Sequence, residues 1–151
     1  RFMIQYQFKT FESLSIQELY AIMQVRNDVF VYEQHCYYQD LDDKDQACIH
    51  VLGWNEQQKL VAYCRILPPG LTYPTHSIGR VLVISAYRKQ QLGRALMQKT
   101  LDYILSTYGK VPLTIEAQLY LQAFYESLGF VRTSDVFDDA GIDHVEMQLH
   151  L

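Results

Sequence analysis

Cysteine is scarce in this sequence and follows no motif. Cys36, Cys48 and Cys64 are the only three cysteines among 151 residues, and no two of them form a C-x-x-C pair. Structural zinc sites and disulfide-rich secreted domains depend on closely spaced or numerous cysteines. We therefore expect buried free thiols, no metal ion and a reducing, cytoplasmic environment.

Long apolar stretches are absent as well. No run approaches the roughly 18 apolar residues that a membrane span requires. The first residues, RFMIQYQF, lack the basic-then-apolar layout of a signal peptide. No repeat or low-complexity segment divides the chain, and three of its four prolines fall in one loop, PPGLTYPT. We expect residues 1–151 to form a single globular domain that does not enter a membrane.

Acidic residues are missing from one long segment. Between Glu56 and Asp102 lie 45 residues with seven lysines and arginines and no aspartate or glutamate, although the whole chain has a net charge of −4. The negative total argues against non-specific nucleic-acid binding. A basic segment within an acidic chain indicates either a solvated surface or a local site for an anionic ligand.

Hydrophobic periodicity predicts an alternation of strands and helices. Three helices are expected, over residues 16–31, 92–108 and 119–128. Strands are expected over residues 2–8, 47–53, 60–67, 77–84, 111–117, 130–137 and 142–151. The order β-α-β-β-β-α-β-α-β-β predicts an α/β (α+β) fold, in which helices pack on a mixed sheet.

The first of these helices has a clear start signal. Ser15 is a good cap, and Glu18 completes a capping box three residues later. Apolar side chains at helical spacing predict the buried face of this helix. They are Ile16, Leu19, Tyr20, Met23 and Phe30.

An acidic loop, YYQDLDDKDQ, follows this helix. Its aspartates are Asp40, Asp42, Asp43 and Asp45, and the loop lacks the glycine and the terminal glutamate of an EF-hand. We expect a solvated loop. The alternative is that its charge attracts a cationic amine.

A strand, a short turn and a helix meet in the segment RKQQLGRALMQ, which runs from Arg88 to Gln98. The first amides of a helix have no internal partner and lie at the positive end of the helix dipole, so they bind phosphate well. Arg88, Lys89 and Arg94 add positive charge, and Gly93 allows close approach of a ligand. The segment is neither a Walker loop nor a G-x-G-x-x-G dinucleotide motif.

This segment resembles the acyl-CoA signature of the GNAT superfamily of N-acetyltransferases, in which Arg/Gln-x-x-Gly-x-Gly/Ala opens a helix after a strand. Arg88 and Gly93 match the pattern, and Gln91 replaces its first glycine. A second segment, QLYLQAFYESLGF, is similar to the family motif Asn-x-x-Ala-x-x-Phe-Tyr-x-x-x-Gly-Phe. Gln118 and Leu121 replace its asparagine and alanine, and the matching positions are Phe124, Tyr125, Gly129 and Phe130.

The N-terminal half resembles the ElaA-like branch of this superfamily. That branch pairs an R-x-x-V-F-V-x-E-Q segment with an acidic loop, and here the segment begins at Arg26 and contains Glu33. The resemblance covers nearly the whole chain. It implies a GNAT-type fold, with a mixed and mostly antiparallel sheet flanked by helices, and acetyl-CoA as the co-substrate.

The resemblance also implies which residues bind acetyl-CoA. The strand backbone at Val81, Leu82 and Val83 is expected to bond the pantetheine arm and to direct an amide at the thioester oxygen. The basic turn is expected to hold the pyrophosphate through its backbone amides and its charges. The full set is Val81, Leu82, Val83, Arg88, Lys89, Gln90, Gln91, Leu92, Gly93, Arg94, Gln118 and Tyr125.

Three residues are expected to act in catalysis. By the resemblance, Tyr125 donates a proton to the leaving thiolate. An amine that is charged at neutral pH must lose a proton before it attacks. Glu33 and His76 are the candidate bases, because Glu33 lies in the branch motif and an imidazole titrates near neutrality. Glu116 and a chain of water molecules remain as alternatives.

These expectations indicate an enzyme that moves an acetyl group from acetyl-CoA to a primary amine, on a small molecule or a peptide, by direct attack in a ternary complex. A noncatalytic acyl-CoA-binding module on the same fold is the first alternative. A structural protein whose basic segment meets an acidic partner is the second. The sequence permits a homodimer and does not identify the amine.

Overall fold

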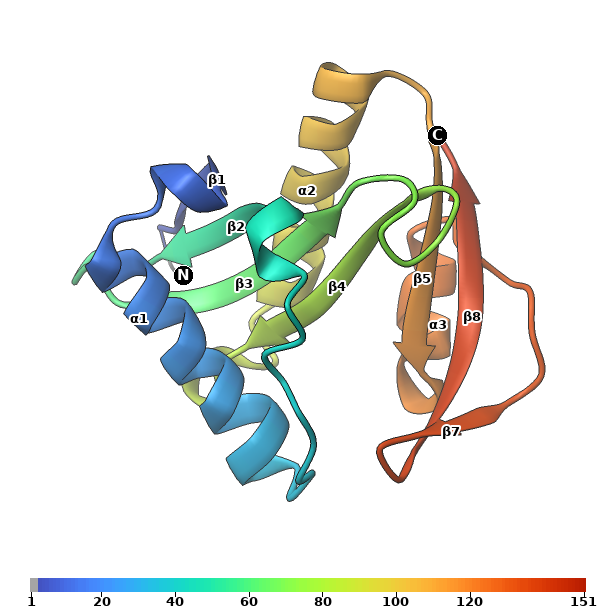
Figure 1. Ribbon diagram of the computed structural model, residues 1–151, viewed down its shortest axis with the longest axis horizontal. Coiled ribbons are helices and arrows are strands. Elements are labelled where there is room, and N and C mark those ends of the chain that lie inside the picture. The colour runs from blue at the N-terminus through green and yellow to red at the C-terminus, as the bar shows by residue number, and fades with distance from the viewer. Residues whose placement is uncertain (1–2) are drawn as a thin grey trace.

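A computed structural model describes residues 3–151, so Phe2, the first residue of the expected N-terminal strand, lies outside the described residues. The strands form one eight-stranded sheet in the order β1-β2-β3-β4-β5-β8-β6, with β7 paired to β8 (Figure 1). The strands are β1 Gln5–Thr10, β2 Ile49–Trp54, β3 Leu60–Leu67, β4 His76–Val83, β5 Pro112–Gln118, β6 Val131–Arg132, β7 Phe137–Asp139 and β8 Ile142–His150. The helices are α1 Ile16–Arg26, α2 Leu92–Tyr108 and α3 Gln122–Ser127.

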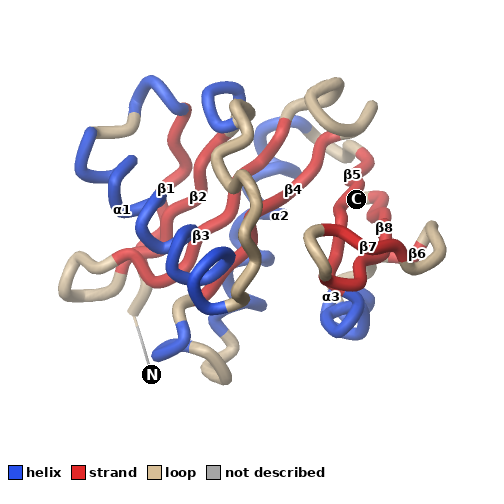
Figure 2. The backbone as a smooth tube through the Cα atoms, turned by 60° about the horizontal axis from the view of Figure 1, so that its bottom comes forward, coloured by secondary structure: helices blue, strands red, loops and turns tan. Residues whose placement is uncertain are grey.

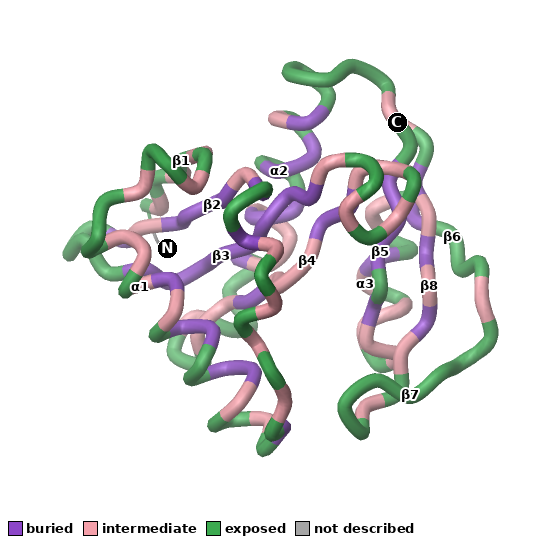
Figure 3. The backbone as a smooth tube through the Cα atoms, in the orientation of Figure 1, coloured by how far each residue is buried: buried purple, intermediate pink, exposed green. Residues whose placement is uncertain are grey.

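Helices cover both faces of the sheet. In Figure 1, α1 lies across the near face of β2 and β3, while α2 and α3 lie behind the sheet. Buried residues accordingly form two clusters, and Figure 3 shows them along the central strands and the inner sides of the helices. The smaller cluster packs α1 on one face, and it includes Ile22, Val29, Leu52 and Tyr63. The larger one packs α2 and α3 on the other, and it includes Val51, Cys64, Leu96, Met97, Ile104 and Ile115.

The predictions for α2 and for the cysteines are confirmed. The stripe of Leu92, Leu96, Thr100 and Ile104 is buried, and Gly109 ends the helix with a φ of 83°. All three cysteines are buried and free. Within residues 3–151, no helix combines the length and the apolar character that crossing a bilayer demands.

The first helix begins as predicted, but its buried face matches the prediction only in part. Ser15 and Glu18 form the expected capping box, and π-helical turns continue α1 to Glu33. However, Ile16 and Tyr20 are 83% and 65% exposed. Phe30 is buried as predicted, Leu19 and Met23 are partly buried, and the other buried positions are Ile22, Val25, Arg26 and Val29. Because this stripe contains an arginine, apolar periodicity alone does not identify the whole buried face.

The segment predicted as one strand over residues 130–137 forms two short strands. Only β6 and β7 within it pair with β8. Between them, the Arg132 side chain donates to the carbonyl of Ser134, and the Ser134 hydroxyl donates to the carbonyl of Asp135, at 2.7 and 2.8 Å. Such local hydrogen bonds compete with pairing in a sheet. The observed order of helices and strands is therefore β-α-β-β-β-α-β-α-β-β-β.

The sheet opens between β4 and β5. These strands are parallel and pair at only two positions, His76 with Leu113 and Ser77 with Thr114. All other pairs of neighbouring strands in the sheet are antiparallel. Figure 2 shows β1–β4 and β5–β8 as two separate halves of the sheet.

A bulge in β4 accounts for the opening. The register with β3 passes from the pair Tyr63–Leu82 to the pair Arg65–Gly79, so three steps along β4 match two steps along β3. Arg80 lies within the bulge and has a φ of 51°. A bulge bends its strand and increases the local twist, which carries the second half of β4 away from β5.

Arginines and aspartates form a network on the α1 face of the sheet, consisting of Arg26, Arg65, Arg80, Asp40, Asp42 and Asp45. Arg26 and Arg65 are only 1% and 2% exposed. The Asp45 Oδ1 atom lies 2.6 Å from Arg26 Nη1 and 2.7 Å from Arg65 Nη1. Asp42 pairs with Arg65 at 2.6 Å, and Asp40 pairs with Arg26 at 3.0 Å.

The network shows that the solvated loop expected for these aspartates is wrong, except at the exposed Asp43. Burial alone would raise the pKa of Asp45. The hydrogen bonds and charges of Arg26 and Arg65 outweigh this effect and hold its pKa below the usual value. The pKa of Asp42 is lowered in the same way, chiefly by Arg65. Buried arginines need such partners. The acidic loop lies on the sheet because its aspartates pair with these arginines.

An Asp45→Asn variant tests the network. It leaves Arg26 and Arg65 short of a shared negative charge, so we expect the free energy of unfolding in urea at pH 7 to fall by about 3 kcal/mol or more. Because the lowered pKa of Asp45 gives stability that is lost as pH falls below about 4, the variant should also lose less stability than the wild type between pH 5 and acid pH. Asp43→Asn is the control and should change stability by less than about 0.5 kcal/mol. Equal stability of the two variants would contradict the structural role of Asp45.

Candidate active site

A cavity of about 1030 Å³ lies where the sheet opens. One side consists of β4 from Ser77 to Val83 and the turn before α2, and the other consists of Glu116 and Gln118 of β5 and Tyr125 of α3. The predicted acetyl-CoA residues that line the cavity are Val81, Leu82, Val83, Arg88, Lys89, Gln91, Leu92, Gly93, Arg94, Gln118 and Tyr125. Gln90 is exposed in the turn and is not among the lining residues. The structure thus brings both sequence motifs to one site.

The β4 backbone at Val83 faces the opening of the sheet. Ile84 donates its amide to Val61 of β3 at 3.0 Å, whereas the Val83 carbonyl accepts a hydrogen bond from Arg88 Nε at 3.0 Å. Successive residues of a strand direct their N–H and C=O groups to opposite edges. The amide of Val83 therefore points away from β3 and towards the cavity, while that of Leu82 points to β3.

The turn before α2 has an unusual backbone. Lys89 and Gln91 have φ values of 65° and 62°, a left-handed conformation that favours glycine. Gln91 is the residue before α2, and no side chain caps the amides that follow it. The conformation gives a physical reason for a glycine at this place in the family signature. It also leaves the first amides of α2 able to bind an anion.

Arg88 is held by Glu33 at the rim of the cavity. The two side chains form an ion pair with two contacts, one of them between Arg88 Nη2 and Glu33 Oε2 at 3.1 Å. Both side chains are partly exposed. The predicted base and the predicted pyrophosphate ligand are thus partners of each other, so an anion at Arg88 must compete with the Glu33 carboxylate.

Arg94 is directed at α3 rather than at the turn. Its Nη2 donates to the Ser127 hydroxyl at 2.7 Å, and its guanidinium lies 5.6 Å from the centre of the Phe124 ring. Gly93 faces the same ring, where an added Cβ would lie 3.9 Å from Phe124. These contacts fix the start of α2 against α3.

Tyr125 is buried beside the cavity and packs edge-on against two aromatic rings. The ring centroids of Phe124 and Phe130 lie 5.2 and 5.8 Å away. Gly129, with a φ of 102°, makes the turn that returns Phe130 to this position. Burial raises the pKa of the Tyr125 phenol far above its ordinary value. The phenol therefore keeps its proton throughout the neutral range and is available there as a donor.

The structure does not bring His76 to this site. His76 lies at the start of β4, where it pairs with Leu113, and its ring centroid lies 4.4 Å from that of Tyr108. It is not among the residues that line the cavity. Burial lowers its pKa.

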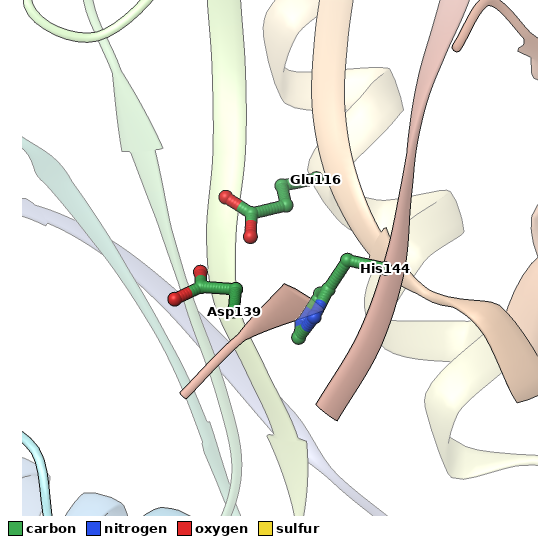
Figure 4. Close-up of side chains that lie close together, drawn as sticks. All are labelled: Glu116, Asp139 and His144. Atoms are coloured by element: carbon green, nitrogen blue, oxygen red, sulfur yellow. The ribbon is translucent and has the colours of Figure 1, made fainter. Parts of the chain in front are cut away.

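Three side chains that sequence patterns do not connect converge on the β5 side of the cavity. Glu116 of β5, Asp139 of β7 and His144 of β8 point towards one another in Figure 4, and one side-chain oxygen or nitrogen atom from each lies within 4.8 Å of the other two. Strand pairing creates the cluster, because Gln118 pairs with His144 and Asp139 with Ile142. The alternating pattern of β8 predicts a strand. No local pattern shows which strand it pairs with, so the sequence does not predict the cluster.

A Gln91→Gly variant tests the strain in the turn before α2. A left-handed residue with a side chain costs roughly 1 kcal/mol that glycine avoids, so we expect the variant to be more stable by about that amount in thermal or urea unfolding. Gln90→Gly is the matched control. Gln90 does not have a positive φ, so glycine there should lower stability by roughly 0.5 kcal/mol through the unfolded state. If both variants are destabilised, the backbone at Gln91 is not as described.

Known proteins share this fold and sequence. A model of the acetyltransferase (GNAT) domain matches residues 12–151. Protein ElaA of Escherichia coli K12 is 41% identical over 147 residues, which cover 96% of this chain and 95% of that protein.

Two crystal structures superpose with a TM-score of 0.92 each. One is Escherichia coli ElaA, with 39% identity over 98% of this chain and all of that one. The other is an acyl-CoA N-acyltransferase from Pseudomonas aeruginosa, with 36% identity over 97% of this chain and 99% of that one. The predicted GNAT-type fold is confirmed. This chain therefore belongs to the GNAT acetyltransferase family, within its ElaA-like branch, and carries an acyltransferase domain.

Proposed function

We propose that this protein is an N-acetyltransferase that moves the acetyl group of acetyl-CoA to a primary amine, by direct attack within a ternary complex. The observation that carries this proposal is the arrangement of two groups in one cavity. The Val83 amide faces the opening of the sheet, and the buried, protonated Tyr125 borders the same space. The Val83 amide suits a hydrogen bond to the oxygen of a thioester, and the Tyr125 phenol suits proton transfer to its sulfur.

The residues along the cavity fit the parts of acetyl-CoA in order. Val81 and Val83 offer backbone groups at the free edge of β4, where an extended pantetheine arm can add as a strand does. The first amides of α2, with Arg88 and Lys89, suit the pyrophosphate. Gln118 places an amide at the end of β5, across from this edge.

Each residue then has a defined task. The Val83 amide donates to the carbonyl oxygen, whose negative charge grows as the amine attacks. Tyr125 donates its proton to the sulfur as the carbon–sulfur bond breaks.

A noncatalytic acyl-CoA-binding module is the competing function. The release of CoA, measured with a thiol reagent over a panel of linear diamines, amino acid amides and arylethylamines, separates the two. We expect amine-dependent release with at least one class. Binding of acetyl-CoA by calorimetry without release for any amine would favour the module, and absence of binding at millimolar acetyl-CoA would exclude both functions.

A Tyr125→Phe variant tests the proton donor. General acid catalysis contributes about 10²- to 10⁴-fold, so we expect kcat with the best amine of the panel to fall by about 100-fold, with little change in the Kd of acetyl-CoA. Tyr103→Phe removes a phenol that does not line the cavity and is the control. If the Tyr125 variant keeps the wild-type rate across the neutral and alkaline range, another group protonates the sulfur.

Variants at the two ends of the Arg88–Glu33 pair should have opposite effects on acetyl-CoA binding. Arg88→Gln removes a charged hydrogen-bond donor, so we expect the Kd to rise about tenfold or more. Glu33→Gln frees Arg88 from an exposed ion pair, so the Kd should fall by up to about fivefold. Lys99→Gln, on the outer face of α2, controls for loss of positive charge. Calorimetry gives all the values, and an unchanged Kd for Arg88→Gln contradicts the pyrophosphate assignment.

A further inference from the structure

We propose that Glu116 accepts the proton of a cationic primary amine at the β5 side of the cavity, and that Asp139 acts as its positioning residue. This inference rests on the proposed function and adds the base that Glu33 and His76 do not supply. Glu33 is held by Arg88 at the rim, and His76 lies outside the cavity.

Strand geometry directs Glu116 into the cavity. Side chains of a strand alternate between its two faces. Ile115 and Ala117 are buried in the core beneath α3, so Glu116 and Gln118 share the opposite face and line the cavity. Glu116 therefore stands across the opened sheet from the free edge of β4, on the side from which an amine can approach the acetyl group.

Asp139 changes the chemistry of Glu116. Glu116 is exposed to the cavity, where neighbouring protein groups bury its carboxylate only in part. This burial raises its pKa to about 8, helped by the hydrogen-bonding contact and the charge of Asp139. Two carboxylates in such contact share a proton. A base with a pKa near the working pH is the most effective kind. By raising the pKa of Glu116, Asp139 suits it to accept a proton at neutral to mildly alkaline pH.

Other charged and titratable groups surround the pair. Arg80 of β4 and Lys44 of the acidic loop act against Asp139 and lower the pKa of Glu116. Burial, Glu116, Glu146 and Asp139 together raise the pKa of Tyr73, in the loop before β4, to about 12. His144 completes the cluster, with its Nδ1 atom 2.7 Å from the carbonyl of Ile142. Glu146 of β8 is the direct cross-strand partner of Glu116.

A cationic amine is the occupant that this pair favours. An ammonium group can take the place of the shared proton and pair with both carboxylates. One ammonium proton passes to Glu116, and the free amine forms the nitrogen–carbon bond as the carbon–sulfur bond breaks. The sulfur takes the proton of Tyr125, which regains one from the nitrogen, and Glu116 then returns its proton to solvent. The net reaction releases one proton.

A pair of acceptors tests the role of Glu116. The best protonated amine of the panel needs a base, whereas hydroxylamine is uncharged at neutral pH and does not. We expect Glu116→Gln to lower kcat by about 100-fold or more with the charged amine, and to change the rate with hydroxylamine and the Kd of acetyl-CoA only slightly. Glu126→Gln, on the exposed side of α3 and outside the cavity, is the matched control.

The pH profile tests Asp139. Because Asp139 raises the pKa of Glu116, Asp139→Asn should shift the rising limb of kcat/KM to lower pH with the charged amine. A merely structural role would lower the rate without moving this limb. If the rising limb does not move, Asp139 has no part in the proposal. If Glu116→Gln keeps the wild-type rate with the charged amine, the whole proposal is overturned. Loss of activity in EDTA that a divalent metal restores would also overturn it, because the cluster would then be a metal site.

A stability measurement tests Glu116 without any acceptor. Its raised pKa means that the folded protein binds a proton that the unfolded chain loses near pH 4.5. Stability is therefore lost as the pH rises towards 8. We expect the Tm of Glu116→Gln, relative to the wild type, to be higher at pH 8.5 than at pH 5. A constant difference contradicts the proposal. If the wild type acetylates neither acceptor but this shift is seen, the proposed function is wrong, while the raised pKa of Glu116 is supported.

Discussion

Two buried arginines, Arg26 and Arg65, are the constraint on which the rest of the structure depends. A guanidinium cannot lose its charge, so each one must be surrounded by acceptors when it leaves water. The acidic loop supplies them, and for this reason it crosses the α1 face of the sheet instead of extending into solvent. The same loop reaches Arg80, whose Nη2 donates to the Asp40 carbonyl at 2.9 Å and stabilises the bulge of β4. The buried ion network thereby supports the opening of the sheet and the cavity.

This network also shows which cations of the basic segment are already paired within the protein. Of its cations, Arg65 and Arg80 are committed to aspartates, and Arg94 is committed to α3. Arg88 and Lys89 lie at the turn before α2, beside backbone amides, and Arg88 pairs there with Glu33 at the rim of the cavity. The cavity therefore has a positive end at this turn and an acidic group at β5. The two ends suit an anionic carrier of the acyl group and a cationic acceptor.

Local patterns predict the local parts of this molecule. The central strands, the α2 stripe, the capping box and the two family motifs all appear where the sequence indicates, because periodicity and turn chemistry act over a few residues. The face of α1 and the fate of the acidic loop could not be predicted in this way, since Arg26 and Arg65 find their partners at distant positions. The cluster around Glu116 depends on the pairing of β5 and β7 with β8, which no short segment encodes. Similarly, the sequence alone does not show that the residue at position 91 has a left-handed backbone, which is why a glycine would suit this place better than the glutamine.

The junction between β4 and β5 has a consequence for how such enzymes diverge. Because two residue pairs alone connect the halves of the sheet, backbone hydrogen bonds barely fix the width of the space between them. Side chains set it instead, through contacts between α2 and α3 such as Arg94 with Phe124 and Ser127. Selection can therefore widen or narrow the cavity by exchanging a few residues where two helices touch. The register of β4 need not change when the width of the cavity does.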